Sequence, residues 1–129
     1  MTVELNHTIV PARDKRRSAE FLSGILGLEA GAQWGPFVPV AVPNGVTLDF
    51  ADTTDDVDEH HYAFLVAEEE FDPIFERIKA AGAGYYADPG RQESGQINHH
   101  WGGRGVYFDD PDGHLMEVIT QPYGTGSPV

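Results

Sequence analysis

The first constraint on the fold is a pattern that occurs twice along the chain. A short apolar strand with a histidine, a helical stretch and a glycine follow one another from His7 to Gly27 and again from His61 to Gly82. The histidine and the glycine are 20 residues apart in the first half (7 to 27) and 21 in the second (61 to 82). Few residues are identical between the halves, so the pattern rather than the sequence repeats. It predicts two similar structural modules.

Apolar spacing predicts one helix in each half. The first extends over 14–26, with Asp14 as its N-cap, and the second over 70–81. Each is ended by the glycine that closes its repeat. We expect Pro73 to lie in the first turn of the second helix, with Asp72 as its cap, because proline is tolerated only near a helix start.

Strand-like segments follow each helix and are joined by turn sequences. The expected pairs are 37–42 with 46–50, and 103–109 with 114–121. Each half is then β-α-β-β-β, and the fold class is α+β. We expect one domain over 1–129, with module one at about 1–56, module two at about 57–122 and a frayed tail over 123–129.

Composition excludes several classes of partner. The formal charge of −13 argues against nucleic acid and against an acidic membrane surface. The apolar runs are too short to span a bilayer, and the N-terminal residues do not form a signal peptide. The absence of cysteine excludes thiolate metal sites and fits a reducing compartment, so we expect a cytoplasmic protein.

Three polar side chains interrupt otherwise apolar strands. They are His7 in Leu5–Val10, His61 in His61–Val66 and Glu117 in Leu115–Ile119. A buried carboxylate is costly unless a positive group holds it. Two histidines and one glutamate suit a divalent ion, and without cysteine Fe, Mn, Zn and Ni all fit. Each residue alone also has a purely structural explanation.

These segments resemble the vicinal oxygen chelate superfamily, which includes glyoxalase I, extradiol dioxygenases, fosfomycin-resistance thiol transferases and bleomycin-resistance proteins. The matching segments cover nearly the whole chain in the family's order. They are Leu5-Asn6-His7, Gly24-Ile25-Leu26-Gly27-Leu28, His61-Tyr62-Ala63-Phe64 and Tyr107-Phe108-Asp109-Asp110-Pro111-Asp112-Gly113-His114-Leu115-Met116-Glu117. The His-Tyr-Ala-Phe segment is most similar to the fosfomycin-resistance branch.

The resemblance implies two βαβββ modules that form an open, cup-shaped mixed sheet with the helices outside. It implies a divalent metal on the floor of the cup, bound by His7, His61 and Glu117. It also implies a homodimer whose cup joins one module from each chain. His114, after the Asp-Pro-Asp-Gly turn, occupies a position that is structural in the family.

A fourth ligand would come from the strand Val46–Phe50. Glyoxalase I has a metal-binding glutamate there, and our alignment places Thr47 at that position. Asp49 lies two residues further on, so it shares a strand face with Thr47 and is the alternative. Thr47 argues against a glyoxalase and leaves two histidines and one carboxylate with open positions, which is the arrangement of oxygen-activating iron sites.

Three further residues are candidates for contact with the substrate. Family members often direct a tyrosine from the position of Tyr107, and its hydroxyl would stabilise oxyanion charge or act as an acid. His99 shares strand parity with Tyr107 and is favoured over His100 as a rim residue. Arg104 lies in the same glycine-rich segment. Packing is the alternative for Tyr107, and a surface loop is the alternative for the others.

The sequence therefore predicts a metal-dependent enzyme that binds a small oxygen-rich or aromatic metabolite through two neighbouring oxygens. Oxygen-dependent or lyase/isomerase chemistry ranks above thiol transfer, since no basic cluster follows Glu117 to bind a phosphonate. The alternative from another class is a metal-free drug- or metabolite-binding protein of the bleomycin-resistance type.

Overall fold

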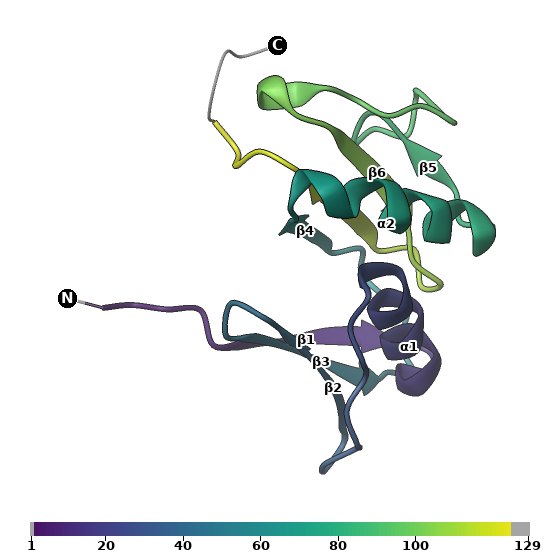
Figure 1. The fold of residues 1–129 in the computed structure, drawn as a ribbon. Helices are drawn as coiled ribbons and strands as arrows, with labels where there is room; N and C mark the ends of the chain where they lie inside the picture. The colour runs from purple at the N-terminus through teal and green to yellow at the C-terminus, as the bar shows by residue number, and fades with distance from the viewer. Residues whose placement is uncertain (1, 125–129) are drawn as a thin grey trace. The chain divides into compact units, whose positions relative to one another are not determined.

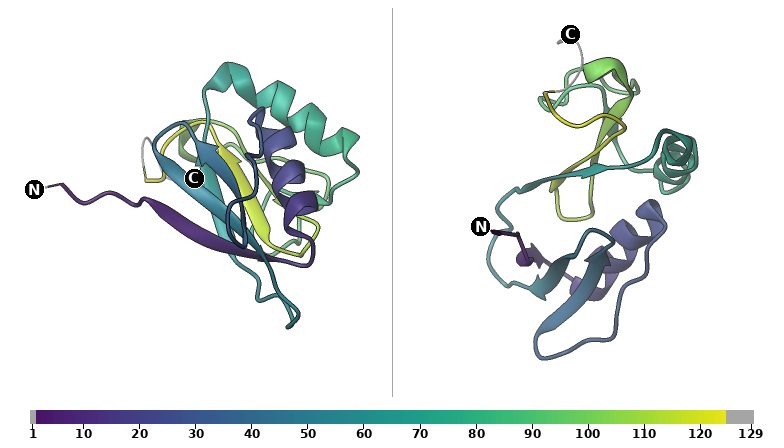
Figure 2. Two further views of the ribbon diagram at one scale, coloured as in Figure 1. Left: turned by 90° about the horizontal axis from the view of Figure 1, so that it is seen from below. Right: turned by 60° about the vertical axis from the view of Figure 1, so that its left-hand side comes forward.

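The computed structural model describes residues 2–124 and divides into two compact modules, with the break between Asp58 and Glu59 (Figure 1). The predicted tail falls largely on 125–129, which lie outside the described residues. Within 2–124, no helix is both long and apolar enough to cross a membrane. The segment before the first strand is extended (Figure 2), and its Val3 and Leu5 side chains are exposed.

Module one contains a three-stranded mixed sheet and one helix. Its elements are β1 (His7–Ala12), α1 (Lys15–Leu26), β2 (Phe37–Val42) and β3 (Val46–Asp52). The sheet order is β1-β3-β2, with β1 parallel and β2 antiparallel to β3. The start of α1 is set locally, because the Asp14 carboxylate accepts a hydrogen bond from the Arg17 amide at 3.1 Å. Gly27 ends the helix in the left-handed conformation with φ 74°. Both predictions for this helix are confirmed.

Strand alternation gives the first sheet one face toward α1 and one face away from it. The buried apolar side chains come from every second position of each strand and from α1: Val10, Ala12, Ala19, Leu22, Ile25, Val38, Val40, Leu48 and Phe50. His7 and Asp49 belong to the alternate positions, on the face that does not carry the helix.

Module two contains a four-stranded mixed sheet with a helix along one face (Figure 1). Its elements are β4 (His61–Leu65), α2 (Glu68–Ala80), β5 (Tyr85–Tyr86), the 3₁₀ turn η1 (His100–Gly102), β6 (Gly105–Asp109) and β7 (Leu115–Ile119). The order is β4-β7-β6-β5, in which only the β4–β7 pair is parallel. Its core against α2 consists of Phe71, Ile74, Ile78, Val106, Phe108, Met116 and Val118.

The start of α2 differs from the prediction. The helix begins at Glu68, its N-cap Ala67 makes no side-chain cap bond, and Pro73 lies in the second turn rather than the first. Asp72 is therefore not the cap. Three glutamates, Glu68 to Glu70, occupy the first turn, where negative charge interacts favourably with the helix dipole. Pro73 removes one hydrogen bond inside the helix, and burial of the flanking Phe71 and Ile74 side chains offsets that loss.

The α+β class and the two modules with open mixed sheets are confirmed. The strand content of module one is one lower than predicted, because only an isolated bridge between Ala30 and Val40 lies where module two has β5. The other strands agree with the prediction to within a few residues. In both modules the first strand lies parallel to the last and the helix connects the first strand to the rest of the sheet.

Candidate metal centre

One face of the module two sheet carries polar side chains at its centre. His61 and Ala63 on β4 pair with Leu115 and Glu117 on β7, and Tyr107 on β6 pairs with Glu117. Because side chains alternate, these residues share the face opposite α2. The sequence predicted His61, Glu117 and Tyr107 as site residues, and the fold brings these three together.

The His61 ring is oriented by two contacts. Its Nδ1 lies 2.9 Å from the Leu115 carbonyl oxygen, and its Nε2 lies 3.1 Å from Oε1 of Glu117. A carbonyl only accepts hydrogen bonds, so Nδ1 carries the proton that it donates there. In the neutral ring Nε2 then presents a lone pair toward a carboxylate. Two acceptors face each other, and a proton or a cation between them satisfies both.

The residues present fit a divalent ion. Two donors that each lie about 2.1 Å from one cation, at right angles, are about 3 Å apart. The Nε2–Oε1 distance of 3.1 Å agrees with this value. A metal-binding histidine also donates its other ring N–H to a carbonyl or carboxylate, as His61 does to Leu115. The side chain of Glu117 is 13% exposed, and that of His61 is 47% exposed, so an ion has access to the pair.

Tyr107 completes the arrangement on β6. Its ring is stacked beside that of His61 at an interplanar angle of 30°, with centroids 6.0 Å apart. Burial raises the pKa of Tyr107 to about 12, and the charge of Glu117 and a hydrogen bond to that carboxylate add to the effect. The hydroxyl therefore keeps its proton at neutral pH. It is placed to donate a hydrogen bond but not to act as a base.

In module one, His7 begins β1 as His61 begins β4. Nδ1 of His7 lies 2.7 Å from Oδ1 of Asn6, so this ring also donates from Nδ1 and leaves Nε2 for a ligand. The His7 side chain is exposed. Within either module, among residues 2–124, no three His, Cys, Asp or Glu side chains gather to hold an ion.

The strand registers distinguish the two candidates for a fourth ligand. His7 pairs with Thr47, and Ile9 pairs with Asp49. In module two, His61 pairs with Leu115, and Ala63 pairs with Glu117. The counterpart of Glu117 is therefore Asp49, whereas Thr47 corresponds to Leu115. This differs from the alignment that placed Thr47 at the ligand position. Asp49 is only 5% exposed, which is unusual for a carboxylate.

Arg104 and His99, the two candidate rim residues, are not part of the polar group on the sheet face of Tyr107. The Arg104 guanidinium contacts Glu68 at 2.6 Å and Asp72 at 2.7 Å, and it packs over the Phe71 ring. Arg104 is thus held by α2, on the sheet face opposite Tyr107. His99 is exposed, and the chain turns directly after it at η1. The alternation argument that favoured His99 fails, because β6 begins only at Gly105. Substrate contact by either residue stays a prediction.

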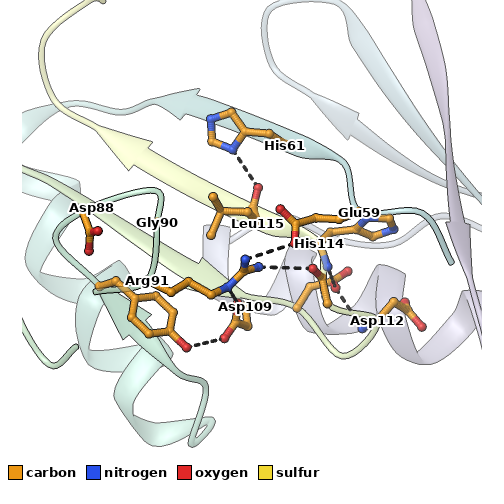
Figure 3. A network of polar contacts seen from close by, with 12 residues as sticks. Glu59, His61, Asp88, Gly90, Arg91, Asp109, Asp112, His114 and Leu115 are labelled. Atoms are coloured by element: carbon orange, nitrogen blue, oxygen red, sulfur yellow. Dashed lines mark hydrogen bonds and ion pairs between the residues drawn. The ribbon is translucent and has the colours of Figure 1, made fainter. Parts of the chain in front are cut away.

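Sequence reasoning missed a polar network at the end of this sheet (Figure 3). Arg91 donates from Nε to Asp109 at 2.8 Å, from Nη1 to Glu59 at 3.0 Å and from Nη2 to the Gly113 carbonyl at 3.3 Å. The Tyr86 hydroxyl donates to the same Asp109 at 2.7 Å. The sequence signal is weak, because a single arginine in a glycine-containing loop has no periodic context.

The Asp-Pro-Asp-Gly-His segment is structural. His114 is fully buried, and its Nδ1 accepts a hydrogen bond from the His60 amide at 2.9 Å. Asp110 accepts from the amides of Asp112 and His114, while burial raises the pKa of Asp110. Burial and the charge of Asp110 raise the pKa of Tyr62, beside His114, to about 12. This agrees with the structural role expected for His114.

Comparison with known proteins gives the class of protein that this fold and this arrangement define. The sequence profile described as Glyoxalase/Bleomycin resistance protein/Dioxygenase superfamily matches residues 4–118. The chain therefore belongs to this superfamily, the vicinal oxygen chelate superfamily that the motifs indicated.

The relatives are named as enzymes of two kinds. The solved structure of the oxidase ChaP-H2 is 57% identical, with a TM-score of 0.96 over 98% of this chain and 100% of that chain. Glutathione transferase FosA of Serratia marcescens is 32% identical over 124 residues, which are 92% of this chain and 81% of the relative. Metallothiol transferase FosB of Shouchella clausii (strain KSM-K16) is 40% identical over 60 residues, 46% of this chain and 37% of the relative.

Proposed function

We propose that the protein is a metal-dependent enzyme of the oxidase type that binds a small oxygen-rich or aromatic molecule through two neighbouring oxygens. The observation that carries the proposal is the lone pair of His61 Nε2 directed at the Glu117 carboxylate, with Nδ1–H donated to the Leu115 carbonyl. The strong similarity to a protein named as an oxidase supports oxygen-dependent chemistry over lyase or isomerase chemistry.

His7 is the proposed third ligand, and Asp49 is a proposed additional carboxylate. The orientation of the His7 ring and the register position of Asp49 support these assignments. We further propose a homodimer in which modules of the two copies combine. β1 and β4, which carry the two histidines, are each the outermost strand in the order of their sheet. The absence of cysteine supports a reducing, cytoplasmic location.

When bound, a divalent ion would polarise the two substrate oxygens and stabilise negative charge that develops on them. The protein itself orients the metal ligands and donates a hydrogen bond or a proton to the substrate. His61 is held in one tautomer by Leu115, and Glu117 is the register partner of Tyr107 on the neighbouring strand. Tyr107, protonated at neutral pH, donates a hydrogen bond to an oxyanion or gives up its proton as an acid.

The charges of module two argue against a phosphonate substrate. Residues 59–124 contain four Lys or Arg. Arg77 and Lys79 belong to α2, Arg104 is paired with carboxylates of α2, and Arg91 is paired with Glu59 and Asp109. None of these four is available as a free cation beside Tyr107, so a neutral or weakly acidic substrate suits the face better than a dianion.

The test uses the metal itself and a chromophoric probe. Protein purified without an affinity tag is titrated with Fe(II) under anaerobic conditions, and then with 4-nitrocatechol, whose two neighbouring oxygens chelate iron and shift its visible band. We expect the wild type to bind one Fe(II) and the probe. His61→Ala and Glu117→Gln should weaken Fe(II) binding at least about 100-fold, because each removes a ligand. Exposed Glu69 supplies a control, Glu69→Gln.

Two results contradict the proposal. If the wild type binds 4-nitrocatechol equally well with and without metal, the protein is a metal-free binding protein. If Fe(II) binds but the two ligand variants bind it as tightly as Glu69→Gln does, the metal lies elsewhere and the assignment of His61 and Glu117 is wrong.

A further inference from the structure

We propose that Arg91 is a positioning residue that fixes the offset between β4 and β7 at the end where His61 lies, and so sets the geometry of the metal ligands. The proposal deepens the function proposed above and rests on it for the identity of the ligands. Arg91 itself is not a catalytic residue, because its three donor nitrogens are used by the protein.

The three acceptors of Arg91 come from three different segments (Figure 3). Glu59 lies two residues before His61, at the entry to β4. Gly113 lies two residues before Leu115, at the entry to β7, and Asp109 ends β6. A planar guanidinium has its donors in a fixed fork, so it holds its acceptors in one relative geometry. Arg91 therefore connects the starts of both strands that carry the metal ligands.

The connection acts on the contact that orients His61. Leu115 donates its amide to the His60 carbonyl at 2.9 Å and accepts the Nδ1–H of His61 at its own carbonyl. Glu59 and Gly113 flank this paired unit on the N-terminal side of each strand. Metal ligands tolerate deviations of only about 0.2 Å, so a small slip between the strands would spoil the His61–Glu117 distance.

The backbone conformation of Arg91 supports this positioning role. Its φ is +58°, and among residues 2–124 only Arg91 and Trp101 adopt a positive φ without being glycine. An arginine in this conformation is unfavourable and is retained only when the surroundings hold it. Here the Asp88 carboxylate accepts the amides of Gln92 and Glu93, which fixes the loop that presents Arg91.

A second arginine of the same module provides a matched control. Arg104 also holds two carboxylates, Glu68 and Asp72, but it does so on the face that carries α2. The side chains are similarly exposed, 29% for Arg91 and 24% for Arg104. Arg91→Ala and Arg104→Ala should therefore lose comparable ion pairs, while only the first should affect the metal ligands.

The experiment has two readouts on the full chain. The first is amide hydrogen exchange of the metal-free protein, which compares Leu115, bonded to His60, with Val66, bonded to Ile119 at the other end of the same strand pair. The second is titration with Co(II), followed by its visible spectrum, which reports affinity and coordination geometry. Glu59→Gln, a milder change that leaves the Arg91–Asp109 pair intact, is included in case Arg91→Ala fails to fold.

We expect Arg91→Ala to speed exchange at Leu115 at least about tenfold and to leave Val66 unchanged. Co(II) affinity should fall about 10- to 100-fold with an altered spectrum, the range typical of groups that orient a ligand. Arg91→Lys should recover part of the loss, Glu59→Gln should shift both readouts in the same direction, and Arg104→Ala should match the wild type.

The proposal is overturned if Arg91→Ala and Glu59→Gln leave Leu115 exchange at the wild-type rate, or if Arg104→Ala changes both readouts as much as Arg91→Ala does. A response of Leu115 exchange in a protein that binds no Co(II) would support the strand-fixing role and refute the metal-dependent function. If the wild type binds Co(II) and Arg91→Ala changes neither readout, the result supports the metal-dependent function and refutes the strand-fixing role of Arg91.

Discussion

Tyr107 and Glu117 are register partners on neighbouring antiparallel strands, and burial together with the charge of Glu117 raises the pKa of Tyr107. The same carboxylate faces Nε2 of His61 on the other side. A single side chain thus joins the proposed metal ligand on β4 to the proposed proton donor on β6. Substitution of Tyr107 should therefore change the affinity for a bound small molecule more than the affinity for the metal ion.

Removal of the hydroxyl alone tests the donor role of Tyr107. Tyr107→Phe keeps the ring beside His61 and should leave Fe(II) affinity within a few-fold of the wild type. The affinity of the Fe(II) protein for 4-nitrocatechol should fall about tenfold, which corresponds to one lost hydrogen bond of about 1.4 kcal/mol. Spectrophotometric titration measures both constants. Unchanged probe affinity would mean that Tyr107 does not contact the bound oxygens.

The pH dependence of stability follows from the two buried tyrosines. The pKa values of Tyr62 and Tyr107 are raised to about 12 from an ordinary value of 10. Between these values the unfolded chain has lost protons that the folded protein keeps, so the free energy of unfolding should fall as the pH rises from 10 to 12. Urea unfolding at pH 9 and pH 11 measures the fall. It should be smaller in Tyr107→Phe, and an equal fall in that variant would contradict the burial argument.

Bound metal should stabilise the folded protein. An ion that binds only the native state at 100 times its dissociation constant adds about 2.7 kcal/mol to the free energy of unfolding. We expect Co(II) to raise the melting temperature of the wild type and a chelator to reverse the rise. Glu117→Gln should show no rise, because it retains the shape but loses the charged ligand. A similar rise in both proteins would point to a site without Glu117.

Two glycines in regular secondary structure, Gly105 in β6 and Gly24 in α1, should respond in opposite ways to substitution by alanine. A Cβ at Gly105 would lie 2.8 Å from the Asn98 amide oxygen, and Asn98 is buried and bonded to the Ala87 carbonyl. Gly105→Ala should therefore destabilise by about 1–3 kcal/mol. Gly24 lies in α1 with open space around it, so Gly24→Ala should stabilise by about 0.5–1 kcal/mol. Chemical denaturation measures both changes in the free energy of unfolding. Changes in the same direction would refute the packing argument.

Prediction from sequence succeeded where structure is set by neighbours in the chain. The ends of α1 follow from Asp14 and Gly27, which act within a few residues of the helix. The start of α2 was missed because its N-cap makes no side-chain bond, so no local signal marked it. Strand register could not be predicted from the sequence, so Thr47 was aligned with the metal-binding glutamate of glyoxalase I and Asp49 was kept as the alternative, whereas the registers place Asp49 in the position equivalent to Glu117.

The sequence by itself determined the repeated α+β pattern, the family and the residue types of the proposed metal ligands, because periodicity, caps and motifs depend on residues close together in the chain. The tertiary structure decided which partners those residues have. It joined His61 to Glu117, 56 residues apart, and Arg91 to Glu59, 32 residues apart. It also assigned Arg104 to the helix face. Such contacts depend on how strands pair in space, so the sequence around an isolated charged residue in a loop does not identify its distant partner.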